Sequence, residues 1–231
     1  MNKFALHLAL LLLAAPLALA DEPASAVPAA APAPHAFSRA SLGVFLSYWN
    51  AEDLDGFDAD GFLGGGVVGQ FQLSGLFSAE CRVGAFGAGD QRDVFDPGEG
   101  WFENTATVVA IPLEAGILAT LKLSDSFSVY GGPGVGFYFF DAEFTSEQGR
   151  WKETYDADVD DEFGFYALLG ARAHLARNVS LFAEAKYTWV ETEMDLPFPA
   201  ARADRFENSP SLSGDLDFGG LSLQAGALFS F

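Results

Sequence analysis

The stretch Leu221–Phe231, which reads LSLQAGALFSF, decides the fold. Its residues alternate in character with a period of two. The odd-numbered positions, which begin with Leu221 and Leu223, are all apolar. The even-numbered positions, which begin with Ser222 and Gln224, are polar or small except for one larger apolar residue. Such alternation is typical of a β-strand whose two faces meet different environments.

The same alternation recurs upstream, so the chain is predicted to contain seven further strands. It is strongest in the four segments that precede the last one and weaker in the two glycine-rich segments nearest the N-terminus. The predicted strands centre on 40–50, 63–73, 79–85, 109–122, 127–139, 163–174 and 181–189.

The connections between these strands alternate in length. Tight turns are expected near Ser74-Gly75, Ser124-Asp125 and Arg177-Asn178. The other four connections are long and cover 51–61, 88–103, 141–161 and 191–215. An even number of strands with short turns at one end and long loops at the other is typical of an outer-membrane barrel. The predicted fold is all-β: an eight-stranded antiparallel transmembrane β-barrel with short periplasmic turns and four long extracellular loops.

The charged residues of the predicted strands share one face, opposite a face of Leu, Ile, Val, Ala and Phe. A soluble barrel would turn that apolar face inward, but it is too large for an eight-stranded interior. Turning it toward lipid leaves acids and bases to pair inside the lumen, as a polar plug. The expected lumen charge network is Glu80, Arg82, Glu114, Arg172, Glu184 and Lys186.

Composition excludes several classes of protein. Of 231 residues, 12 are Lys or Arg and 32 are Asp or Glu, which gives a formal charge of −20. Phosphate binding needs a basic surface, so no nucleic-acid partner is expected. A chain that is 50% apolar is not disordered, and its single Cys excludes an intramolecular disulfide framework.

The N-terminus has the features of a targeting segment. Residues 1–20 combine Lys3, an apolar run and the small-residue site Ala18-Leu19-Ala20, a pattern that predicts a secretory signal peptide. Residues 21–39 are rich in Ala and Pro and are expected to form a periplasmic linker. The barrel domain is predicted to span 40–231.

Aromatic residues fall near both ends of the predicted strands, where girdles at the two membrane interfaces are expected. Trp49, Tyr187 and Trp189 are placed at the loop end, and Phe229 and Phe231 at the turn end.

Most acids fall in the long connections. Alternate Asp residues near a Gly can present oxygens to Ca²⁺, although neither cluster matches a complete calcium loop. A solvated acidic surface is the alternative interpretation. The candidate ligands of weak Ca²⁺ binding, the one cofactor considered, are Asp53, Asp55, Asp58, Asp60, Asp156, Asp158 and Asp160.

Three segments carry a resemblance to a known family: Ile111-Pro112-Leu113 with Gly116, Tyr130–Gly136 (YGGPGVG) and Ser180–Tyr187 (SLFAEAKY). In this order they resemble the small outer-membrane β-barrel superfamily of Gram-negative bacteria, of the OmpA, OmpX and opacity-protein type. The resemblance implies an outer-membrane location among lipid and lipopolysaccharide. It also implies that the terminal Phe231 is read by the barrel-assembly machinery.

The sequence points to a function less sharply than to a fold. Related barrels that are enzymes need a His near the outer rim, and the predicted loops contain none, so no enzymatic activity is expected. One hypothesis is a structural or surface-interaction protein that displays acidic loops to a surface ligand. The alternative is a narrow porin-like channel or small-solute transporter, and a lesser one is a divalent-cation-binding surface protein.

Overall fold

The structure is a computed structural model that describes residues 40–52, 61–96, 100–149, 151–195 and 214–231. The predicted signal peptide and linker lie outside the described residues, as do Asp53, Asp55, Asp58 and Asp60. Among the described residues, no helix is long and apolar enough to cross a membrane.

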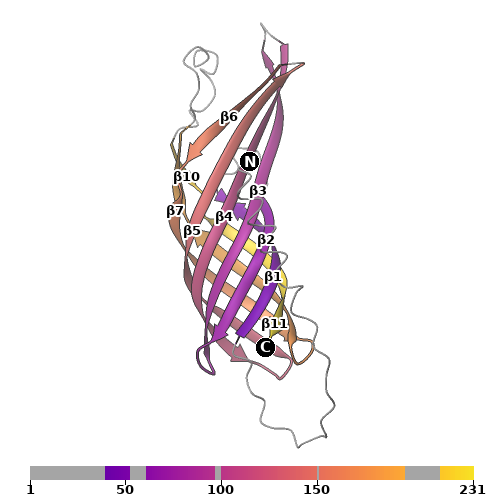
Figure 1. Ribbon diagram of the computed structural model, residues 1–231, viewed down its shortest axis with the longest axis vertical. Helices are drawn as coiled ribbons and strands as arrows, with labels where there is room; N and C mark the ends of the chain where they lie inside the picture. Colours follow the sequence, from indigo (N-terminus) through magenta and orange to yellow (C-terminus); the bar gives the residue numbers. More distant parts are fainter. Residues whose placement is uncertain (1–39, 53–60, 97–99, 150, 196–213) are drawn as a thin grey trace, which may run out of the picture.

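The described chain is built from antiparallel β-strands (Figure 1). Their bounds are β1 Ala40–Ala51, β2 Phe62–Gln72, β3 Phe77–Asp96, β4 Gly100–Lys122, β5 Phe127–Gln148, β6 Trp151–Val159, β7 Glu162–His174, β8 Val179–Trp189, β9 Glu191–Asp195, β10 Gly214–Asp217 and β11 Gly220–Ser230.

Eight of these strands close into a ring in the order β1, β2, β3, β4, β5, β7, β8 and β11. The first and last strands of the ring pair directly, from Ser41 opposite Ser230 to Ala51 opposite Gly220. Closure leaves no unpaired sheet edge within the ring, which is what hydrocarbon requires of any strand that crosses it. The predicted eight-stranded antiparallel barrel is therefore confirmed.

The short turns all lie at the end of the barrel that holds the C-terminus (Figure 1). Each is closed by a backbone hydrogen bond at its base: Leu73 N–H donates to Phe77 O, Leu123 to Phe127 O and Leu175 to Val179 O. The terminal Phe231 N–H donates to Ala40 O at the same end. The three predicted tight turns are thus in place.

The strand faces have the polarity of a membrane barrel. Outward-facing apolar side chains are widely exposed, including Leu46 at 75%, Leu63 at 70% and Leu169 at 69%. Inward-facing charged side chains are buried, with Glu80 at 3% exposed and Arg82 at 2%. Water would reverse this arrangement, so the outer face is matched to lipid.

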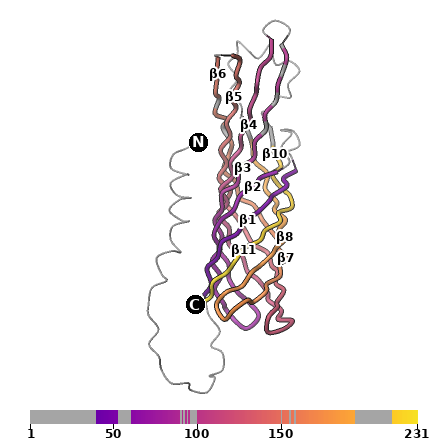
Figure 2. The backbone as a smooth tube through the Cα atoms, turned by 90° about the vertical axis from the view of Figure 1, so that its right-hand side faces the viewer, coloured from indigo at the N-terminus to yellow at the C-terminus, as the bar shows by residue number. Residues whose placement is uncertain are grey.

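Two of the segments predicted to be loops consist largely of paired strands instead. The segment 88–103 is a continued hairpin of β3 and β4, paired as far as Asp96 opposite Gly100. The segment 141–161 is mostly a hairpin of β5 and β6, from Ala142 opposite Ala157 to Gln148 opposite Trp151. Figure 2 shows these strands rising well beyond the ring. Further strands, β9 and β10, add to β6, so the ring carries a sheet that we call the surface extension.

The reason for the error lies in the environment of the strands. Above the ring, an outward side chain meets water instead of lipid. The outward positions of β4 accordingly change from Leu113 and Ile111 to Thr107 and Glu103. The strands stay paired there, but their outward residues are no longer apolar. The alternation by which a membrane-spanning strand is recognised in the sequence is therefore absent.

Glycines inside the ring make room for large aromatic side chains. Gly134 pairs with Tyr166 across β5 and β7, and the Tyr166 ring covers both Gly134 and its neighbour Gly116. A Cβ on Gly134 would lie 2.1 Å from Cζ of Tyr166, far inside van der Waals contact. Tyr166 itself is 1% exposed.

We expect Gly134→Ala to destabilise the barrel by about 1–3 kcal/mol, because the Tyr166 ring must leave a packed position. The measurement is the midpoint of urea unfolding in lipid vesicles. Gly87→Ala is the matched control, because a Cβ there meets nothing within 4 Å. Equal stability of the two variants would contradict the close packing of Tyr166.

Candidate functional site

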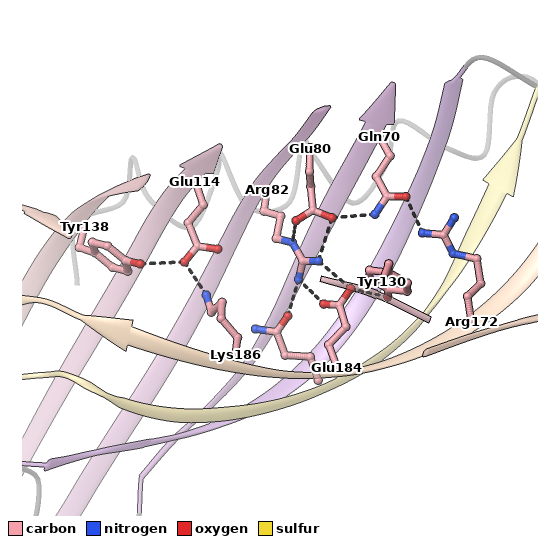
Figure 3. Close-up of polar contacts among 10 residues, drawn as sticks. Gln70, Glu80, Arg82, Glu114, Tyr130, Tyr138, Arg172, Glu184 and Lys186 are labelled. Atoms are coloured by element: carbon pink, nitrogen blue, oxygen red, sulfur yellow. Dashed lines mark hydrogen bonds and ion pairs between the residues drawn. The ribbon is translucent and has the colours of Figure 1, made fainter. Parts of the chain in front are cut away.

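The centre of the lumen holds Arg82 between two carboxylates (Figure 3). Arg82 Nε donates to Glu80 Oε1 at 2.6 Å, and Nη2 donates to Glu80 Oε2 at 2.9 Å. On the other side, Nη2 donates to Glu184 Oε1 at 2.8 Å, and Nη1 lies 2.5 Å from Glu184 Oε2. The guanidinium thus pairs with two side chains, each no more than 1% exposed. Such an arrangement is stable only because every charge has a close partner.

Amide and phenol groups complete this cluster. Arg82 Nη1 donates to Gln224 Oε1 at 2.6 Å, and Tyr130 Oη donates to Glu184 Oε1 at 2.6 Å. Gln70 Nε2 donates to Glu80 Oε2 at 2.6 Å and accepts at Oε1 from Arg172 Nη2 at 2.6 Å. We call these seven side chains the central network: Gln70, Glu80, Arg82, Tyr130, Arg172, Glu184 and Gln224.

A second ion pair lies beside the central network. Lys186 Nζ donates to Glu114 Oε1, and Tyr138 Oη donates to the same oxygen at 2.9 Å. The ammonium also lies 5.3 Å from the centroid of the Tyr166 ring, within the range of a cation–π contact. Together the two clusters balance three acids against three bases.

The six charged residues expected in the lumen therefore lie there. The expected pairing of each base with an acid does not hold for Arg172. Arg82 takes two carboxylates, whereas Arg172 contacts the Gln70 amide and the face of Tyr130, with its guanidinium carbon 4.9 Å from the ring centroid. Arg172 is only partly buried, although its Nε is buried without a hydrogen-bond partner among the described residues.

Aromatic side chains fill the lumen between the ionic clusters and the surface extension. Trp49 stacks on Phe62 with centroids 5.1 Å apart, and Phe62 meets Phe218 at 5.8 Å. Phe218 in turn stacks on Phe140 at 4.8 Å. We call the inward-facing rings Trp49, Phe62, Phe86, Tyr138, Phe140 and Phe218 the aromatic layer. The sequence predicts a polar plug, and this aromatic layer is an addition that the sequence pattern did not indicate.

The placement of Trp49 at the membrane interface is wrong. Trp49 is 3% exposed and points into the barrel, because it shares the parity of Phe45 and Ser47, which are also buried. Its neighbour Tyr48 is the outward aromatic residue, at 42% exposed. Counting by two from Ser47 places Trp49 on the same face, but β1 has no charged residue to show that this face is the inward one.

The other interface aromatics face outward. Trp189 is 52% exposed, Phe229 50% and Phe231 74%. Tyr187 packs beside Trp189 with ring centroids 4.8 Å apart, and its phenol donates to Glu52 Oε1 at 2.7 Å. These positions are those of rings at the two ends of the lipid-facing wall.

The candidate calcium ligands are only partly described. Asp156 and Asp160 are exposed on the surface extension, and the side chain of Asp158 lies outside what the structure describes. Among the described residues, no group of three or more His, Cys, Asp or Glu side chains is arranged to hold a metal ion. Calcium binding stays a prediction.

Comparison with known protein families agrees with the closed β-barrel described above. A model of the family described as outer membrane protein beta-barrel domain matches residues 8–229. The chain belongs to this family. It is accordingly an outer-membrane protein, and the location predicted from its sequence is confirmed. No curated protein sequence matches it closely enough to indicate a relative.

The chain is similar to several solved structures. OprG of Pseudomonas aeruginosa is 15% identical with a TM-score of 0.57, covering 84% of this chain and 97% of that one. Neisserial surface protein A is 10% identical with a TM-score of 0.49, covering 84% and 98%. A major outer membrane protein of Thermus thermophilus is 15% identical with a TM-score of 0.46, covering 83% and 99%. At such identities, the likeness to OprG shows the fold alone.

Arg82→Met is expected to destabilise the folded barrel by about 3–5 kcal/mol, because it leaves Glu80 and Glu184 buried without a cation. Urea unfolding in lipid vesicles measures the change. Adding Glu80→Gln and Glu184→Gln to the same chain is expected to recover part of the loss, because it removes the uncompensated charges.

The matched control is Lys152→Met, which breaks the exposed pair of Lys152 and Glu147, separated by 2.5 Å. Its unfolding midpoint is expected to equal that of the wild type, because solvent screens exposed pairs. A loss as large as that of Arg82→Met would show that burial does not govern the strength of the central network.

Proposed function

We propose that this protein is a closed outer-membrane barrel whose role is exerted by the surface extension, in contact with a partner outside the cell. The observation that carries the proposal is the set of polar bridges that cross the lumen. It favours a surface-interaction role over a channel or transporter.

The bridges join opposite walls of the ring. Arg82 on β3 pairs with Glu184 on β8, which is four strands away in either direction around the ring. Gln70 on β2 and Arg172 on β7 are likewise four strands apart. An eight-stranded barrel is only wide enough for its own side chains, so each bridge occupies the full width.

Opening such a lumen is energetically costly. Separating Arg82 from its two carboxylates would leave buried charges unpaired, at about 3–5 kcal/mol for each broken pair. The aromatic layer adds a second barrier toward the surface, because its rings pack against each other from several strands. Both features disfavour passage of solutes along the barrel axis.

Catalysis is not part of the proposal. His174 Nδ1 lies 2.8 Å from Ser180 Oγ at the turn end of the barrel, but Ser180 is 4% exposed and out of reach of a substrate. Among the described residues, no carboxylate is hydrogen-bonded to His174, so the group that would orient a catalytic base is lacking.

We expect the whole chain, reconstituted in planar lipid bilayers, to give no stable conductance steps. The reason is that the lumen bridges keep the barrel closed. An established porin added to the same bilayer is the control that the assay detects open barrels. Stable steps of one size, lost on heat denaturation, would overturn the closed-barrel proposal and favour the narrow channel.

A further inference from the structure

In the surface extension, β3 pairs on one side only within the described residues. The ladder between β2 and β3 ends at Leu63 opposite Gly87, whereas β3 continues beside β4 as far as Asp96. From Ala88 to Asp96, no described residue pairs with the free side of β3. Figure 2 shows this hairpin rising beyond the ring. An unpaired strand edge offers backbone N–H and C=O groups to another extended segment.

The outer face beside this edge carries a row of acids. Asp93 on β3 lies opposite Glu103 on β4, and Glu103 lies opposite Glu147 on β5. Like charges directly opposite each other in a sheet are destabilising, so a cation placed near Asp93 and Glu103 would stabilise this face. The fourth residue of the row is Lys152 on β6, which is the one farthest from β3.

The pKa of Lys152 is affected by the negative charge of this face. It donates to Glu147 Oε1 at 2.5 Å. That hydrogen bond, followed by the charges of Glu147, Glu143 and Glu103, raises the pKa of Lys152 above its ordinary value. The acids nearest the free edge, Asp93 and Glu103, lie at the other side of the row.

An exposed aromatic pair lies at the tip of the same hairpin. Phe95 is 55% exposed and Trp101 67%, and their ring centroids are 5.2 Å apart. Both lie beyond the row of acids, on the same face, and far from the lipid-facing wall. Exposed large rings outside the membrane are typical anchors of a binding surface.

We propose that the β3 edge from Ala88 to Asp96 binds an extended, basic segment of another polypeptide by adding it to the sheet as a further strand. Alternate Lys or Arg side chains of that segment face Asp93 and Glu103, and its end contacts Phe95 and Trp101. This inference rests on the proposed surface-interaction role and names the chemistry of the partner.

Two other occupants fit less well. Copies in one membrane related by a two-fold axis along its normal would present their β3 strands in parallel. Each strand from Ala88 to Asp96 contains three Asp and one Arg, so two strands of like net charge would meet. The segment 53–60 of the chain itself contains four acids, Asp53, Asp55, Asp58 and Asp60, so charge also disfavours it. A basic partner would not meet the charge repulsion that disfavours a second copy and the segment 53–60.

The test uses a fluorescent nine-residue peptide of alternating Lys and Thr, with the whole chain folded in zwitterionic detergent micelles. We expect saturable binding by fluorescence anisotropy. A peptide of alternating Glu and Thr is expected not to bind. A Lys-Thr peptide with N-methyl groups on alternate amides along one edge keeps its charge but loses strand pairing, and should bind about tenfold or more weakly.

Variants of the chain locate the site. Asp93→Asn with Glu103→Gln is expected to weaken binding about tenfold, and Trp101→Ala to weaken it as well. Lys152→Gln is expected to strengthen binding, because it removes the competing base. Asp125→Asn is the matched control, an exposed acid in a short turn at the opposite end of the barrel, and it should bind as the wild type does.

Several outcomes overturn the inference. Equal binding of the N-methylated peptide means charge attraction without strand addition. Equal binding by the Asp93/Glu103 variant places the site elsewhere. Absence of binding with chain dimers in the same micelles assigns the edge to a second copy. Each result is independent of conductance, so failure here leaves the closed-barrel proposal standing, and conductance steps leave this site standing.

Discussion

A guanidinium group with two carboxylates in the middle of a closed lumen is the constraint on which the rest of the structure depends. Arg82 and Glu80 come from one strand, and Glu184 comes from the opposite wall. Charges in such a position must be paired, so the ring can hold only one register that brings all three together. A shift of β8 by one residue would turn Glu184 and Lys186 toward lipid, where neither finds a partner.

The glycines of β5 and its neighbours follow from the same constraint. A lumen filled by bridging side chains has little space left, and the rings that flank the network need positions without a Cβ. Gly134 and Gly116 accommodate Tyr166, and Gly170 accommodates Tyr130, whose phenol completes the coordination of Glu184. Packing and hydrogen bonding therefore fix each other, and small and large residues alternate around the wall.

The sequence allowed the ring to be predicted because lipid imposes a strict period of two. Glu184 and Lys186 alternate with apolar residues along β8, so their inward direction was evident. The pairing within the lumen was harder, because partners lie on opposite walls and depend on barrel width and register. Because β1 carries no charge to mark its inner face, its sequence alone does not place Trp49, and with it the aromatic layer, inside the lumen.

The surface extension was missed for a different physical reason, and that reason also bears on function. Along β5 the outward residues change from Phe137 and Phe139 to Asp141 and Glu143, while the inward residues Phe140 and Ala142 stay apolar. The strand itself is continuous, but its polarity inverts where lipid gives way to water. Beyond that level the sheet has apolar side chains inside and polar ones outside, as in a soluble protein, whereas the β3 edge combines Asp93 and Glu103 with the exposed rings of Phe95 and Trp101. Acids and exposed rings thus gather at a strand edge that pairs with no described residue, and this is the physical ground for placing a partner chain there.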